Sequence, residues 1–308
     1  MPAVVFINPG HDTGGAGIAF KQAFDKAGWR ANAICRNETY LQYPTDIVWT
    51  PKTRSKTVVA LLEAADVVHA MNSPRPLGWF TPRADQTLVV HHLGTTYRRD
   101  PEGQSAICRE YGAIEVTDSI DLLFDHVGWL PIPADLPALS HLRARVYRAS
   151  RSVRIAHAPT DREYKDTEAV MQAVESLGRK YPITFDLIEG VTNRHCLERK
   201  AEADIFVDQL KYGFGMNAIE AWAMGIPVVS GMDDEAGKQR GLAMWGHLPW
   251  ADATAKTLEA VIEHLIVDMD WRLRLAERGK RHAERWHSQQ AAVEMATALY
   301  GQKAEAVA

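Results

Sequence analysis

The chain has 308 residues, of which 46% are hydrophobic and 24% are charged, and its formal net charge at pH 7 is -4. This composition excludes a largely disordered chain, and the small net charge excludes a molecule that attracts nucleic acid over its whole surface. The length allows two domains, each with its own hydrophobic core.

The three cysteines, Cys35, Cys108 and Cys196, are far apart in the sequence. Their odd number and wide spacing argue against a disulfide framework and against a structural zinc site. The first residues, MPAVVFINPGHD, contain an apolar stretch too short for a signal peptide, and no run approaches the about 18 apolar residues of a membrane helix. We therefore expect a cytoplasmic protein.

The first half of the chain alternates between strand and helix patterns. An apolar run at residues 3–7 is followed by the loop NPGHDTGG and then by small or apolar residues at helical spacing, up to Gly28. A strand, a glycine-rich loop and a helix in this order open a nucleotide-binding α/β domain. Further strands are expected at residues 32–35, 66–69, 88–91 and 114–116, which predicts a largely parallel sheet.

The second half repeats this alternation after a proline-rich segment, residues 128–139, that predicts an extended connection. Strands are expected at residues 153–157, 184–188, 204–207 and 228–230, and helices at residues 167–181, 194–200 and 216–224. Residues 253–299 have a helical pattern throughout. The sequence therefore predicts two α/β units in tandem.

Residues 211–229, KYGFGMNAIEAWAMGIPVV, contain one carboxylate, Glu220, in an otherwise apolar helix pattern. The glycine loop that precedes this helix lets its first N–H groups and its dipole attract an anion such as a diphosphate. A buried carboxylate needs a hydrogen-bonding partner. Two partners fit Glu220: the paired hydroxyls of a nucleotide ribose, or N–H groups of a neighbouring loop.

The same segment, from Tyr212 to Val229, resembles the donor-binding signature of retaining GT-B glycosyltransferases of the family-four-like group (glycosyl transferases group 1). That signature has two glutamates with seven residues between them, a helix of small residues and a Gly-x-Pro-Val-Val strand. The second glutamate matches Glu220, which the resemblance assigns to the ribose of a nucleotide-diphosphate sugar. Tyr212 replaces the first glutamate, which in the family helps to hold the transferred sugar.

Two further segments extend the resemblance. Residues 154–174, RIAHAPTDREYKDTEAVMQAV, resemble the family's strand, loop and helix in which an arginine and a lysine grip the diphosphate, which implies this role for Arg162 and Lys165. DTGGAG resembles the family's first loop, and TLVVHHLGTTYR resembles a later strand that ends in a histidine. These matches imply that His92 contacts the sugar, with His91 as the alternative.

The resemblance implies the GT-B fold, which is α/β with two Rossmann-like domains facing each other across a cleft. Residues 1–135 would form the acceptor-side domain and residues 136–285 the donor domain, with a helix at 286–308 crossing back to the first domain. The implied catalytic residues are His92, Arg162 and Lys165. The implied donor-binding residues are Gly15, Gly17, Tyr212, Gly213, Phe214, Gly215, Met216, Asn217 and Glu220.

The function that follows is retaining transfer of a sugar, most simply a hexose, from a nucleotide-diphosphate sugar to a hydroxyl group, with no metal and no cofactor. An epimerase or a phosphorylase of the same fold is one alternative. A catalytically degenerate module that only binds a nucleotide sugar is another, because Tyr212 and the histidine motif depart from the family pattern.

The acceptor stays open between a saccharide, a lipid-linked saccharide, a protein and modified DNA. Two arginine-rich segments, residues 141–154 and 272–285, suggest contact with DNA or with an anionic membrane surface. Both also show helical spacing, so a solvated charged surface is the alternative.

Overall fold

The computed structural model describes residues 1–50 and 54–306. The chain divides into two compact units, which are described separately: unit 1 comprises residues 1–133 and 288–308, and unit 2 comprises residues 134–287. The sequence placed the corresponding boundaries at residues 135 and 285. None of the helices in the described part of the chain combines the length and the apolar character needed to span a membrane.

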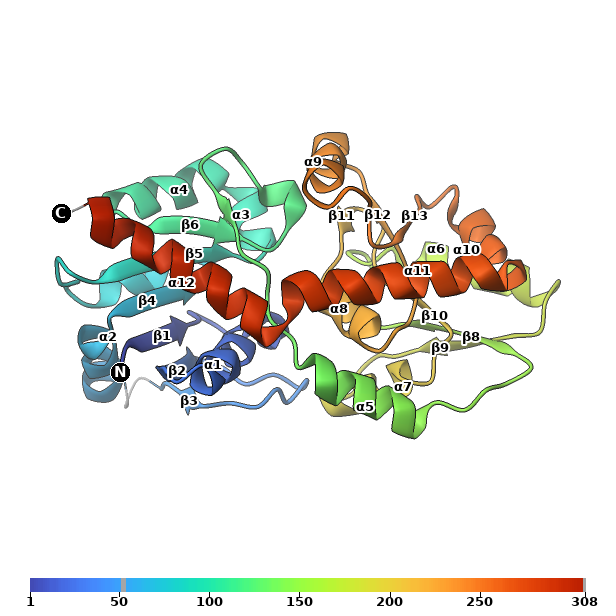
Figure 1. Cartoon of the computed structure of the whole chain (residues 1–308), viewed down its shortest axis with the longest axis horizontal. Coiled ribbons are helices and arrows are strands. Elements are labelled where there is room, and N and C mark those ends of the chain that lie inside the picture. The colour runs from blue at the N-terminus through green and yellow to red at the C-terminus, as the bar shows by residue number, and fades with distance from the viewer. Residues whose placement is uncertain (51–53, 307–308) are drawn as a thin grey trace. The chain divides into compact units, whose positions relative to one another are not determined.

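Unit 1 is built on a seven-stranded sheet with the order β3-β2-β1-β4-β5-β6-β7, in which every pair is parallel (Figure 1). Its strands are β1 (Ala3–Ile7), β2 (Arg30–Cys35), β3 (Ile47–Val48), β4 (Val67–Met71), β5 (Thr87–His92), β6 (Ile114–Thr117) and β7 (Gly128–Trp129). The strand order reverses between β1 and β4, the type of position at which open α/β sheets bind ligands.

The helical segments of unit 1 are η1 (Thr13–Gly15), α1 (Ala16–Lys26), η2 (Arg54–Val58), α2 (Val59–Ala64), η3 (Arg75–Trp79), α3 (Thr95–Arg99), α4 (Pro101–Glu110), η4 (Ile120–Leu122) and α12 (Gln289–Ala306). As expected, α1 ends just before Gly28, which has the positive φ of 83° that favours glycine. α12 belongs to unit 1 and packs on α1, where the Tyr300 ring lies 5.9 Å from that of Phe24.

Unit 2 contains a six-stranded sheet with the order β11-β12-β10-β8-β9, and β13 pairs with β12. Its strands are β8 (Val153–His157), β9 (Ile183–Leu187), β10 (Ile205–Val207), β11 (Tyr212–Gly213), β12 (Val228–Met232) and β13 (Ala251–Asp252). All pairs are parallel except that of β11 with β12.

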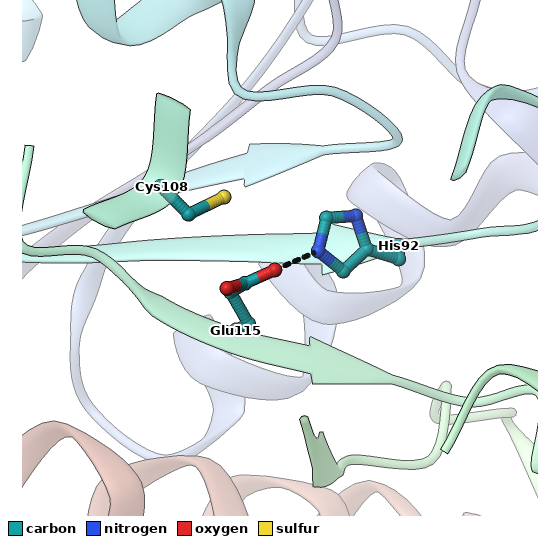
Figure 2. A group of neighbouring side chains, drawn as sticks. All are labelled: His92, Cys108 and Glu115. Carbon is teal, nitrogen blue, oxygen red and sulfur yellow. Dashed lines mark hydrogen bonds and ion pairs between the residues drawn. The ribbon is translucent and has the colours of Figure 1, made fainter. Parts of the chain in front are cut away.

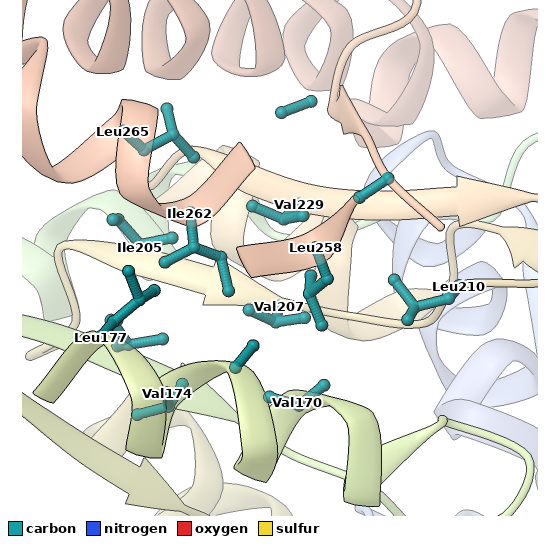
Figure 3. Packing of buried hydrophobic residues seen from close by; sticks show 14 of the residues in the cluster. Val170, Val174, Leu177, Ile205, Val207, Leu210, Val229, Leu258, Ile262 and Leu265 are labelled. Atoms are coloured by element: carbon teal, nitrogen blue, oxygen red, sulfur yellow. The ribbon is translucent and has the colours of Figure 1, made fainter. Parts of the chain in front are cut away.

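The helical segments of unit 2 are α5 (Leu136–Val146), α6 (Thr167–Gly178), α7 (Asn193–Lys200), α8 (Met216–Ala223), α9 (Glu235–Trp245), α10 (Leu258–Val267), α11 (Met269–His282) and η5 (Ala283–His287). Apolar side chains of α6 and α10 meet those of β10 and β12 in one buried cluster (Figure 3). The predicted α/β class with two Rossmann-like units is confirmed, and the short strands β3, β7, β11 and β13 are additions to it.

Candidate functional site

The N-terminus of α8 lies where β10 ends, and Asp208 occupies it. Asp208 directly follows β10, its side chain is 1% exposed, and its Oδ2 accepts a hydrogen bond of 2.8 Å from the N–H of Gly215. Its Oδ1 lies 2.6 Å from the Nζ of Lys165, in the loop after β8. A helix N-terminus and a lysine thus converge at one point, and a fixed carboxylate holds both.

One turn into α8, Glu220 forms an ion pair with Lys200 of α7. The Lys200 side chain is fully buried, and its Nζ also donates to Oδ1 of Asn217 at 2.6 Å. Burial alone would lower the pKa of Lys200, but the Glu220 carboxylate raises it above its usual range. A lysine side chain thus takes the place of the loop N–H groups, one of the two partners expected for Glu220, and the contact with a ribose stays a prediction.

Arg162 lies on the surface of the loop between β8 and α6. Its guanidinium makes two hydrogen bonds to the Glu189 carboxylate, of 2.8 and 2.7 Å, and an ion pair of 3.3 Å with Glu168. The side chain is half exposed. Arg162 is therefore oriented by carboxylates here, and a bound diphosphate would have to compete with them.

Tyr212 stands where the family signature has its first glutamate. Its ring stacks on that of Tyr164, in the loop between β8 and α6. Their ring centroids are 4.6 Å apart with an angle of 21° between the planes. Lys165 directly follows Tyr164, so the stack joins the loop that carries Lys165 to the strand β11 that leads into α8. An aromatic contact thus replaces the polar group that the family pattern places at this position.

Among the predicted donor-binding residues of the loop before α8, Phe214 has a side chain that is buried away from solvent. Its side chain is 5% exposed and lies in an aromatic cluster, with ring centroids 5.0 Å from Trp222 and 5.8 Å from Trp250. Only its backbone remains for a ligand. The other predicted residues of this segment lead into α8 or belong to its first turn: Gly213 ends β11, Gly215 directly precedes α8, and Met216 and Asn217 begin the helix.

In unit 1, the glycine loop after β1 is likewise occupied by a carboxylate. Asp12 accepts hydrogen bonds from the N–H groups of Gly17 and Ile18, at 2.8 and 2.9 Å, and the Gly15 N–H bonds to its carbonyl at 3.3 Å. Burial raises the pKa of Asp12, and these two N–H groups oppose the rise. The N–H groups of Gly15 and Gly17, which were predicted to bind donor phosphates, thus already donate to Asp12.

His92 lies in the interior of unit 1, at the end of β5. Its ring is fully buried, stacks on Tyr97 at 3.7 Å, and has Nε2 at 2.9 Å from Oε2 of Glu115. Among the described residues, Nδ1 of His92 has no hydrogen-bond partner, and contact of His92 with the sugar stays a prediction. The alternative, His91, is also fully buried.

His92, Cys108 and Glu115 are also the group of side chains, among the residues described, that could hold a metal ion (Figure 2). Their ligand atoms lie within 4.8 Å of one another, and zinc accepts all three types. However, Glu115 already accepts hydrogen bonds from His92 and from the Ser105 hydroxyl, which lies 2.6 Å away. Burial alone would raise the pKa of Glu115, but these bonds lower it, so the Glu115 carboxylate is satisfied by hydrogen bonds.

The arginine-rich segments make contacts within unit 2. Arg143 donates to the carbonyls of Ala201 and Ala203, at 2.5 and 2.7 Å, and covers the ring of Tyr147. In the second segment, Arg278 donates to the Trp250 carbonyl. Several of these charges are therefore engaged in holding the fold, and contact with DNA or a membrane stays a prediction.

The sequence analysis missed Asp12, Lys200 and Asp208. Asp208 could have been found, because a carboxylate directly after a buried strand and before a glycine loop faces the helix N-terminus. Lys200 carries no such signal, since it stands in the charged helix sequence NRHCLERK. Only the need of Glu220 for a partner pointed to it.

No family model and no curated protein matches the sequence. Solved structures match its fold: an α-glucosyltransferase in complex with UDP and a 13-mer DNA that contains a central A:G mismatch has 11% identity and a TM-score of 0.69, covering 97% of this chain and 99% of its own. HepE from Anabaena, in complex with UDP and glucose, has 14% identity and a TM-score of 0.65, covering 97% and 99%. Sucrose-phosphate synthase from Thermosynechococcus elongatus has 14% identity and a TM-score of 0.60, covering 99% and 100%. The GT-B fold predicted from the sequence is thereby confirmed.

Proposed function

We propose that this chain, which has the GT-B glycosyltransferase fold, transfers a hexose from a nucleotide-diphosphate sugar to a hydroxyl acceptor. The observation that carries the proposal is the N-terminus of α8, where Lys165 and the Gly215 N–H converge beside the buried Glu220. Structures with the same fold that bind UDP support a nucleotide diphosphate as the leaving group.

The diphosphate would bind at this N-terminus by displacing the Asp208 carboxylate from Lys165 and from the Gly215 N–H. Both groups are anions, and both suit the N–H of Gly215 and the ammonium of Lys165. Negative charge builds up on the diphosphate as the nucleotide leaves. Lys165 and the dipole of α8 stabilise this charge. Arg162 adds a second positive charge when it turns from Glu189 to the phosphate.

Glu220 would bind the ribose of the nucleotide. Lys200 binds Oε2 of Glu220 and thereby fixes the orientation of the carboxylate. We assign the ribose hydroxyls to Oε1. Lys200 then acts as a positioning residue, since it does not itself reach the ligand.

We further propose that the anomeric configuration is retained and that no metal is needed. In the mechanism that the resemblance implies, a donor phosphate oxygen takes the proton of the acceptor on the face from which the nucleotide leaves. The enzyme then supplies no nucleophile. An epimerase, a phosphorylase and a module that only binds the donor are the alternatives.

The experiment is to incubate the protein with UDP-, ADP- and GDP-hexoses in the presence of EDTA and to measure the binding heat and the release of free nucleotide. Glu220→Gln is compared with Glu175→Gln, which changes an exposed carboxylate of unit 2. We expect selective binding of one donor, weakened in Glu220→Gln alone. If the donor is converted into its epimer when no acceptor is present, the protein is an epimerase. If the donor binds but never turns over, the protein is a module that only binds the nucleotide sugar.

The ribose contact is tested with the 2′-deoxy form of the preferred nucleotide. If Glu220 binds the ribose, wild type prefers the ribonucleotide and Glu220→Gln loses most of that preference. An equal preference in both proteins would make Glu220 a purely structural partner of Lys200. Proton NMR of the first product gives the anomeric configuration, and an inverted product would contradict retention.

A further inference from the structure

A pocket of about 350 Å³ opens at the carboxyl edge of the unit 1 sheet. Its walls come from the loop after β1 and from the segment between β2 and β3, and they include Asp12, Glu38, Thr39, Gln42, Tyr43 and Thr45. This edge is where open α/β sheets bind ligands, and the volume falls in the range of small-molecule sites. The donor-site residues of unit 2 are not part of it.

The pocket has a built wall. The Arg36 N–H donates to the Gly10 carbonyl at 2.7 Å, which ties the segment after β2 to the loop after β1. The ring of Tyr43 lies against Gly15, where a Cβ would come within 2.6 Å of the ring. Gln42 has a positive φ of 51°, a conformation that costs energy for a side chain of this type and that clusters at ligand sites.

The charge of the pocket is negative. Asp12 and Glu38 line it, and no lysine or arginine stands among its described lining residues. Asp12 already fills the N-terminus of α1, so the helix dipole is not available to an incoming anion. Burial raises the pKa of the neighbouring Cys35 thiol to about 11, with the negative charges of Asp12 and Glu38 adding to the rise.

The polar groups of the pocket suit hydroxyl groups. Carboxylates accept hydrogen bonds from hydroxyls, and the side chains of Thr39, Gln42 and Thr45 can donate and accept. The Thr45 hydroxyl donates to Oε1 of Glu38 at 3.1 Å, which orients this carboxylate at the pocket wall. An aromatic ring such as that of Tyr43 offers an apolar face to the C–H groups of a sugar ring.

We propose that this pocket binds the acceptor and that it selects a hydroxyl-rich acceptor without negative charge, a saccharide, over phosphorylated sugars and nucleic acid. The inference rests on the proposed glycosyltransferase function and adds the class of its second substrate. Two carboxylates, with no lysine or arginine among the described lining residues, repel phosphate groups, whereas they bind neutral or amino sugars.

The first experiment is direct binding, independent of the donor. Ligand-observed NMR measures the affinity of the full chain for mono- and disaccharides, glucosamine, glucose 6-phosphate and a 13-mer DNA. We expect wild type to bind one or more uncharged or amino saccharides, Glu38→Gln to bind them about fivefold more weakly, and Glu38→Lys to gain affinity for the sugar phosphate. Glu110→Gln, which changes an exposed carboxylate of α4 away from the pocket, should match wild type.

The second experiment follows nucleotide release from the preferred donor with each acceptor. Acceleration by uncharged saccharides, reduced in Glu38→Gln, supports the inference. If the donor turns over but only the phosphorylated sugar or the DNA accelerates it, the proposed function stands and the inference fails. If no donor binds, the proposed function fails, and the NMR titration still decides: a pocket that binds no saccharide, or binds the anions more tightly, overturns the inference.

Discussion

The ammonium of Lys200 and the carboxylate of Glu220 form an ion pair in the interior of unit 2. Lys200 is fully buried, and its Nζ also lies 4.9 Å from the ring of Phe206. Placing two charges in the interior is costly, and it is tolerated because each neutralises the other. The single carboxylate in the apolar α8 sequence is thus explained by a partner on α7.

Replacement of one partner should therefore destabilise the protein. Lys200→Met leaves the Glu220 carboxylate buried and unpaired, and we expect a loss of about 3–5 kcal/mol in the free energy of unfolding. The uncharged pair Lys200→Met/Glu220→Gln should recover part of this loss. Thermal unfolding of the three proteins measures both effects, and a double variant no more stable than Lys200→Met would contradict the ion-pair account.

Asp208→Asn should strengthen binding of a nucleoside diphosphate. Asparagine keeps an oxygen for the Gly215 N–H but removes the negative charge that competes with phosphate for Lys165. We expect an affinity for UDP, or for the preferred nucleotide, about tenfold higher than that of wild type, equivalent to about 1.4 kcal/mol. Calorimetric titration gives the value, and the isosteric change Asp186→Asn at an ion pair of β9 serves as the control. Weaker binding would show that Asp208 supports the site instead of blocking it.

The fold could be predicted from the sequence because its longer strands are rich in apolar residues, as in AVVFI of β1, and alternate with helical patterns. The strands expected at residues 3–7 and 153–157 have the bounds of β1 and β8. The two-residue strands, such as β3 and β7, have no pattern of their own and exist only through pairing with a neighbour.

The site was less predictable, since side-chain direction at a strand end depends on tertiary contacts. The motif placed Lys165 and Glu220 near the N-terminus and the first turns of α8, where both are found. It did not reveal that His92 turns inward to Glu115, because a histidine at the end of a strand fits an interior or an exposed position equally well.

The cluster of His92, Cys108 and Glu115 gives a prediction about metals. Since Glu115 is satisfied by hydrogen bonds, we expect the purified protein to contain less than stoichiometric zinc and to keep its donor turnover in EDTA. Elemental analysis of wild type and Cys108→Ser checks this. One equivalent of zinc in wild type that is lost in Cys108→Ser would establish a metal centre in unit 1.

Tyr212 gives a prediction about the donor site. Tyr212→Phe keeps the ring that stacks on Tyr164, so donor affinity should stay within about twofold of wild type. Tyr212→Ala removes the stack, and we expect affinity to fall about fivefold because the loop that carries Lys165 loses its support. Equal effects of the two changes would assign the role to the hydroxyl group instead of the ring.

His282 gives a prediction about acid stability. Burial lowers the pKa of His282 to about 2, and its Nε2 has no hydrogen-bond partner among the described residues. Below a pH of about 6.5 the unfolded chain binds a proton at this histidine and the folded chain does not, so stability falls by about 1.4 kcal/mol per pH unit.

His282→Phe removes this proton uptake and keeps an aromatic ring beside Trp222 and Trp245, which lie 5.2 and 4.7 Å away. At pH 7 the variant should be at least as stable as wild type, since it buries no unpaired nitrogen. At pH 5 the free energy of unfolding of the variant, relative to that of wild type, should be about 2 kcal/mol higher than at pH 7. Thermal unfolding of both full-length chains at the two pH values measures this growth. Because His69 in unit 1, with a pKa of about 3, is unchanged, the variant should still lose some stability in acid. Parallel losses in the two proteins would show that His282 becomes protonated in the folded state.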